Sequence, residues 1–190
     1  MLVMVVVLLT RIVVSRCEKL CKRAGVWNTV LMRVLAIDPG FDRVGIAILE
    51  RQKGKEIVLF SECLITNRTD TFLERLSMIG ERVRVIISEW SPTLLAMESL
   101  LFAKNQTTAL RVAEARGVVA YEAARAGLPL REFSPPQVKL ATTGYGRADK
   151  KQMAHMVRII TGLGADKKLD DELDAIAVGI TCLAIHTPDK

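Results

Sequence analysis

The stretch "RVLAIDPGFDRVGIAIL" at residues 33–49 decides the fold. An apolar run from Val34 ends on a single carboxylate, Asp38, and a Pro-Gly turn leads into a second apolar run that begins at Val44. Two short apolar runs rich in β-branched residues and separated by a turn predict a pair of antiparallel strands. Because a charged residue is rarely buried without a partner, Asp38 at the end of such a strand is a candidate functional residue.

The rest of the chain predicts strands that alternate with helices. Further strands are predicted at 56–65, 94–99 and 129–134, and helices at 70–92, 107–127, 136–142, 150–162 and 169–186. Three closely spaced strands followed by this alternation predict an α/β fold, a mixed five-stranded sheet with helices on both faces. No internal repeat and no second domain are visible, so residues 32–190 are predicted to be one domain.

Residues 1–31 are interpreted as an N-terminal extension to this domain. Its first 14 residues, "MLVMVVVLLTRIVV", are strongly apolar, but Arg11 interrupts this run, and the run is shorter than the ~20 residues of a membrane span. Three interpretations stay open: a short membrane-associating anchor, a docked helix, or an over-extended gene start with the true start at Met32, which we favour. We expect no stable membrane partner. The four cysteines lack a nearby histidine set, which favours reduced thiols and a cytoplasmic protein.

Acidic side chains recur at positions that suit a metal site. Glu98 closes the apolar strand at 94–99, and Asp171 and Asp174 share a face of the last helix, as Asp170 and Asp174 do. Taken alone, the helix cluster is also explained by an acidic helix start that the helix dipole stabilises. Taken with Asp38, these carboxylates would repel one another if they met, and a divalent cation would remove that cost. Oxygen ligands suit Mg²⁺ or Mn²⁺, and two such ions about 4 Å apart can hydrolyse a phosphodiester.

Basic side chains flank the acidic ones, in a chain of net charge +6. Lys and Arg residues near 104–116 and 139–151 are candidates for holding a nucleic-acid backbone, although any single one can equally be a solvated surface charge. Phe102 can belong to the core or can wedge against a base.

Four segments together resemble the RuvC family of Holliday-junction resolvases. These segments are "LAIDPGFDRVGIAI", "AMESLLFAKNQTTALRVAEARGV", "PPQVKLATTGYGRADKKQMAHMV" and "DELDAIAVGIT", in order from Val34 to His186. The resemblance implies an RNase H-like fold and a homodimeric endonuclease that cuts four-way DNA junctions symmetrically with Mg²⁺. It also implies a place in recombinational repair beside a junction branch-migration motor.

The resemblance also assigns roles to residues. It implies that Asp38, Glu98, Asp171 and Asp174 are the catalytic, metal-binding acids and that Lys150 takes part in cleavage. The expected DNA-binding set is Phe102, Lys104, Arg116, Lys139, Arg147 and Lys150. The family's dimer contact falls on the helix at 107–126. The sequence departs from the family at Leu101, where an aromatic residue is usual, and it leaves open whether Asp170 or Asp171 is the ligand.

Three other functions remain as alternatives. One is a resolvase-like nuclease that acts on ribosomal RNA precursors, which matches the "QVK" to "ADK" segment less well. Another is an actin-like ATPase or sugar kinase, which needs a longer chain and a second phosphate-binding turn. The last is a junction-binding protein without nuclease activity, against which the complete acidic set argues.

Overall fold

The structure is a computed structural model that describes residues 32–100, 106–164 and 168–185. The strands are β1 (Arg33–Asp38), β2 (Arg43–Gln52), β3 (Lys55–Ile65), β4 (Leu94–Glu98) and β5 (Leu130–Phe133). The helices are α2 (Phe72–Trp90), α3 (Gln106–Arg125), α4 (Pro135–Thr143), α5 (Lys150–Thr161) and α6 (Asp170–Ile185). The N-terminal extension lies outside the described residues. No helix among those described is long and apolar enough to cross a membrane.

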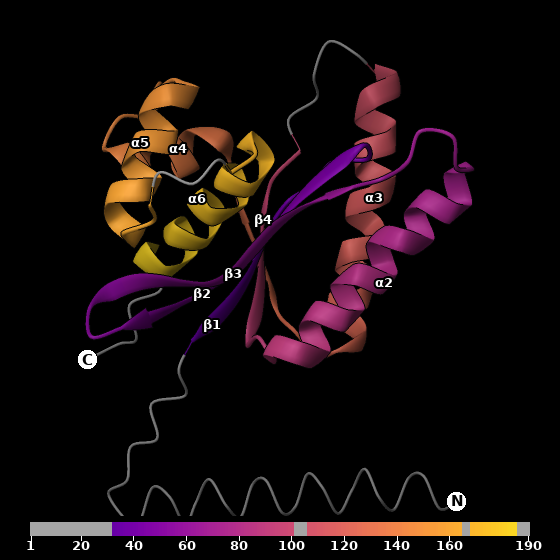
Figure 1. Ribbon diagram of the computed structural model, residues 1–190, viewed down its shortest axis with the longest axis horizontal. Helices are drawn as coiled ribbons and strands as arrows, with labels where there is room; N and C mark the ends of the chain where they lie inside the picture. Colours follow the sequence, from indigo (N-terminus) through magenta and orange to yellow (C-terminus); the bar gives the residue numbers. More distant parts are fainter. Residues whose placement is uncertain (1–31, 101–105, 165–167, 186–190) are drawn as a thin grey trace, which may run out of the picture. The chain divides into compact units, whose positions relative to one another are not determined.

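The five strands form one mixed sheet in the order β3-β2-β1-β4-β5. The three N-terminal strands are antiparallel neighbours, whereas β4 and β5 join the sheet in parallel. Helices α2 and α3 cover one face of the sheet, and α4, α5 and α6 lie on the other (Figure 1). The predicted α/β fold with helices on both faces is therefore confirmed.

Strand alternation decides which way the first acidic residue points. Leu35 and Ile37 of β1 are buried against α2 and α3, whereas Val34 and Ala36 belong to the core under α4–α6. Successive side chains of a strand point to opposite faces. Asp38 is the next member of the second series, so its carboxylate is directed to the face that α6 covers.

The same alternation places Glu98 beside Asp38. In β4, Met97 packs against α2 and α3, whereas Ala96 faces α6, so Glu98 continues the α6 side. Strands β1 and β4 pair in parallel up to Ile37 and Met97, which brings their carboxyl ends to one edge of the sheet. Two acids that lie 60 residues apart in the chain thus become neighbours through strand register alone.

Helix α6 comes unusually close to the sheet. It is buried almost all round, from Glu172 to Leu183, and it rests on small residues of three strands: Ala36, Ala47 and Ala96. Gly45 pairs with Asp38 across β1 and β2, and a Cβ at Gly45 would lie 1.9 Å from the backbone oxygen of Asp171. Only glycine lets the first turn of α6 approach the end of β1 this closely.

A buried polar group ties the first turn of α6 to the edge strand β3. The carboxylate of Glu172 accepts hydrogen bonds from Ser61 Oγ at 2.7 Å and from Lys168 Nζ at 2.5 Å. Burial alone would raise the pKa of Glu172, but these hydrogen bonds outweigh it and lower the pKa. Glu172 therefore stays charged, and its carboxylate is directed to Ser61 and Lys168.

Candidate metal-dependent nuclease site

The predicted acidic residues meet at the carboxyl ends of β1 and β4. Burial, followed by the negative charges of Asp174, Glu98 and Asp171, raises the pKa of Asp38 to about 7 against the opposing effect of Lys150. Each of these three carboxylates is thus close enough to act on Asp38 electrostatically. With Asp38, the four acids come from three elements that lie far apart in the chain, β1, β4 and α6, so the cluster is a product of the fold.

The pKa values of Glu98 and Asp174 are raised as well. Burial, followed by the charge of Asp174, raises the pKa of Glu98, while Lys139 opposes the rise. Burial also raises the pKa of Asp174, against Lys150 and Lys139. The pKa values of all three carboxylates are raised, so the negative charge at this site exceeds the positive charge that neighbouring side chains supply.

Two of the predicted lysines lie at this site. Lys150 begins α5, and its Nζ is 3.9 Å from Oδ2 of both Asp170 and Asp174. Lys139, from α4, lowers the pKa values of Glu98 and Asp174 by its charge. The structure thus brings both lysines to the carboxylates.

Arg43, at the start of β2, is a site residue that the sequence did not single out. Its guanidinium donates to Oδ2 of Asp171, and Cys63 Sγ lies 3.9 Å from the same oxygen. The signal available in the sequence was its place two residues before Gly45, on the strand that pairs with β1. Asp171 acts on Asp38, whereas Asp170 is directed to Lys150 and affects only Asp174 among these acids. This difference supports Asp171 over Asp170 as a ligand.

The donor set fits a hard divalent cation in its chemistry. Among residues 32–100, 106–164 and 168–185, no three His, Cys, Asp or Glu side chains stand ready as a closed ligand set. Asp171 pairs with Arg43, and Oδ2 of Asp174 lies 3.9 Å from Lys150 Nζ. Buried carboxylates that repel one another and have raised pKa values gain most from a bound cation, and oxygen ligands suit Mg²⁺ or Mn²⁺.

The remaining predicted DNA contacts have different positions. Phe102 and Lys104 lie outside the described residues. Arg147 is exposed in the loop between α4 and α5. Arg116 differs from the expectation, because its side chain is 13% exposed, pairs with Glu132 and donates to the backbone oxygen of Glu98. That position makes Arg116 a brace for the end of β4, so we leave it out of the proposed DNA contacts.

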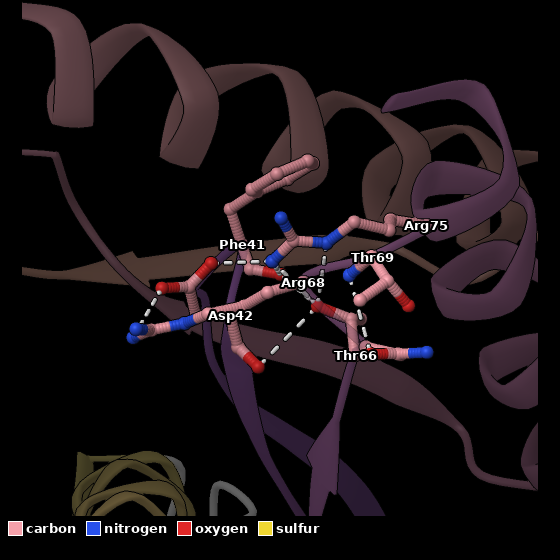
Figure 2. Close-up of polar contacts among 7 residues, drawn as sticks. Phe41, Asp42, Thr66, Arg68, Thr69 and Arg75 are labelled. Carbon is pink, nitrogen blue, oxygen red and sulfur yellow. Dashed lines mark hydrogen bonds and ion pairs between the residues drawn. The ribbon is translucent and has the colours of Figure 1, made fainter. Parts of the chain in front are cut away.

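A second brace holds the turn that follows Asp38. Arg75 of α2 is buried, and its guanidinium donates to Thr66 Oγ1, to the Phe41 carbonyl and to Oδ1 of Asp42 (Figure 2). The same guanidinium lies 3.9 Å from the centroid of the Phe41 ring. Arg75 precedes Ile79 by four residues on the apolar stripe of α2, and an arginine at such a position was the signal for this role.

Replacement of Arg75 by Met is expected to lower the free energy of unfolding by about 2–3 kcal/mol, because Thr66 Oγ1, the Phe41 carbonyl and Asp42 all lose the guanidinium that donates to them. Urea unfolding measures this change. Arg84→Met on the same helix is the control, since Arg84 is exposed and its acidic partner is Glu81 in a weak i,i+3 pair. Equal losses in the two variants would contradict the role of Arg75.

This geometry defines a class of protein. A mixed sheet with carboxylates at the ends of two adjacent parallel strands, faced by further carboxylates on a covering helix, is the arrangement of an RNase H-like nuclease. A profile of the family described as "Crossover junction endodeoxyribonuclease RuvC" matches residues 34–182. The chain belongs to this family.

Curated relatives agree over most of their length. A protein of Thermosipho melanesiensis named "Crossover junction endodeoxyribonuclease RuvC" is 40% identical over 156 residues, which cover 82% of this chain and 99% of the relative. A protein of the same name from Desulfitobacterium hafniense is 42% identical over 149 residues, which cover 78% of this chain and 90% of the relative.

Solved structures give the same result. The structure titled "T. thermophilus RuvC in complex with Holliday junction substrate" has a TM-score of 0.75 and 32% identity and covers 79% of this chain and 92% of its own. The yeast mitochondrial Holliday junction resolvase Ydc2 shares the fold, with a TM-score of 0.60 at 16% identity, 81% of this chain and 78% of its own.

Proposed function

We propose that this protein resolves four-way DNA junctions in recombinational repair by metal-dependent hydrolysis of two phosphodiester bonds. The observation that carries the proposal is the meeting of Asp38, Glu98, Asp171 and Asp174 at one edge of the sheet. The names of the relatives and the junction DNA in the Thermus structure support the same substrate. They do not favour a ribosomal RNA precursor or an ATP-dependent activity.

The four carboxylates would hold the metal, which we propose to be two Mg²⁺ ions that Mn²⁺ can replace. Bound ions of this kind lower the pKa of an attacking water and stabilise charge on the leaving oxygen. The protein's own contribution is to hold the carboxylates from rigid elements and to keep them partly out of water. Lys150 places an ammonium group beside Asp174, where it can stabilise charge on the phosphate.

A homodimer would place two such sites about a two-fold axis, which matches two cuts in a nearly symmetric junction. Exposed apolar residues on α3 support a contact there: Leu110 is 65% exposed and Tyr121 is 60% exposed. We further propose a branch-migration motor as a working partner and the cytoplasm as the location.

Metal withdrawal tests the proposal directly. A synthetic four-way junction, labelled in turn on each strand, is incubated with the protein in Mg²⁺, in Mn²⁺ or in EDTA. We expect paired cuts in two strands of like polarity with either metal and none in EDTA. A linear duplex of the same sequence, an RNA hairpin and ATP serve as competing substrates. Cleavage in EDTA, or faster turnover of a competitor, would overturn the proposal.

A further inference from the structure

An open cleft of about 520 Å³ lies next to the carboxylate site. It is called the arginine cleft here, and its lining includes Phe41, Asp42, Arg43, Arg68, Arg111 and Asp171. The three arginines come from the start of β2, the β3–α2 loop and α3. Asp171 lines this cleft and also acts on Asp38, so the cleft and the carboxylate site adjoin.

The charge of Asp42, an acidic residue that lines the cleft, is already neutralised by arginines. Asp42 lies between two guanidinium groups, with Arg75 on Oδ1 and Arg68 on Oδ2 at 3.1 Å (Figure 2). Arg75 is buried, whereas the Arg68 side chain is 81% exposed. Arg68 can therefore turn to another anion while Asp42 keeps its buried partner.

Arg111 is held in place by aromatic rings. Its guanidinium carbon lies 4.1 Å from the centroid of Phe72 and 5.6 Å from that of Phe41, and the two rings are 5.7 Å apart. A stacked guanidinium keeps its N–H groups free at the rim, where they can grip a phosphate. Arg111 also pairs with Glu114 at 3.4 Å, but both side chains are exposed, so this ion pair is weak.

We propose that the arginine cleft binds a backbone phosphate of the same DNA strand whose neighbouring phosphate enters the carboxylate site, with Arg111 and Arg68 as its ligands. Guanidinium groups bind phosphate oxygens in pairs, and phosphate contacts fix the register of a strand without reading its sequence. The cleft thus sets which linkage reaches the carboxylates. This inference rests on the proposed function.

Binding in EDTA separates this inference from cleavage. Fluorescence anisotropy with a labelled four-way junction gives Kd over a range of salt concentrations. Arg111→Gln is expected to weaken binding about tenfold, the loss of one charged hydrogen-bonding contact. It should also lower the slope of log affinity against log salt by about one. Arg68→Gln should act in the same direction.

Replacing single DNA phosphates by uncharged methylphosphonates shows which phosphate contacts Arg111. Single methylphosphonates are placed at each position around the cut. At one position next to it, wild-type protein should lose affinity about tenfold, whereas Arg111→Gln should lose none further. Arg125→Gln is the matched control, because Arg125 forms an i,i+3 pair with Glu122 and lies near a tyrosine ring on the same helix, about 20 Å along α3.

The outcomes are distinct. If wild-type protein does not bind the junction, both the proposed function and the proposed phosphate site in the arginine cleft are wrong. If it binds while Arg111→Gln and Arg68→Gln keep the wild-type Kd and salt slope, only the cleft proposal falls. Equal losses in Arg125→Gln, or additive losses at every methylphosphonate, also overturn it. Thermal melting shows whether each variant is folded. If Arg111→Gln does not fold, the same binding measurements on Arg68→Gln test the proposal.

Discussion

The Asp38→Asn variant is expected to bind a four-way junction with wild-type affinity in EDTA and to leave it uncut in Mg²⁺. Asp38 is the acidic residue on which the other three carboxylates act, so its loss removes the centre of the proposed ligand set. We expect the cleavage rate to fall by more than about a thousandfold. Single-turnover cleavage and anisotropy measure the two effects. Cleavage that survives the substitution would overturn the metal-carboxylate mechanism.

The same variant should be more stable than the wild type when metal is absent. The pKa of Asp38 is about 7 in the folded protein, against an ordinary value of 3.8. Since the folded state holds this proton more strongly, stability is lost as pH rises from about 4 to about 7 and the loss is complete above that. The difference corresponds to at most about 4 kcal/mol, which asparagine removes. Urea unfolding in EDTA should show the largest gain near pH 8 and a shrinking gain toward pH 4.

Asp42, four residues along the same turn, provides a control of opposite sign. Hydrogen bonding from Arg75 lowers the pKa of Asp42. A lowered pKa gives stability that is present above the unfolded value and is lost in acid. Asp42→Asn should therefore destabilise the protein at neutral pH and have little effect in acid. A gain in both variants at pH 8 would mean that burial around Asp38 does not account for the effect.

Gly45→Ala is expected to lower the cleavage rate strongly in a protein that still folds. The added Cβ would lie 1.9 Å from the Asp171 backbone oxygen and 3.2 Å from the Ala175 Cβ, so the first turn of α6 must move. Overpacking of this kind costs about 1–3 kcal/mol, and a displacement near 1 Å in a reacting group can cost about a hundredfold in rate. Thermal melting and cleavage below the melting temperature measure the two effects.

Gly117→Ala is the stability control for that substitution. Gly117 lies inside α3, and a Cβ there meets nothing within 4 Å. Alanine should stabilise a helix interior by about 0.5–1 kcal/mol over glycine. If Gly45→Ala melted like the wild type and cut at the wild-type rate, the close approach of α6 would not matter for the site.

Much of the fold follows from local patterns in the sequence. Apolar runs and their spacing located every described strand and helix to within a few residues. The helix predicted at 70–92 ends at Trp90, because Ser91 adopts a left-handed backbone and its N–H bonds to Ile87 before Pro92 is reached. The meeting of Asp38 and Glu98 also follows from the sequence once the strands are known, because the two-residue period sends both acids to one face.

The rest of the site depends on contacts between distant residues, which no local pattern encodes. Arg43 meets Asp171 across 128 residues, and its place two residues before Gly45 does not specify Asp171 as its partner. Arg116 shows the converse: its basic neighbourhood suggested a DNA contact, but burial against Glu98 and Glu132 decides its position. The roles of Phe102 and Lys104 stay predictions.

The order of the elements along the chain has a consequence for synthesis in the cell. Asp38 and Glu98 belong to strands that leave the ribosome early, whereas Asp171 and Asp174 belong to α6, which follows every strand. Chains fold progressively from the N-terminal side as they are made. The nascent protein can therefore form its sheet, and even approach DNA, while two of its four proposed catalytic carboxylates have yet to emerge. If cleavage needs all four carboxylates, the chain cannot cut DNA before α6 has been made.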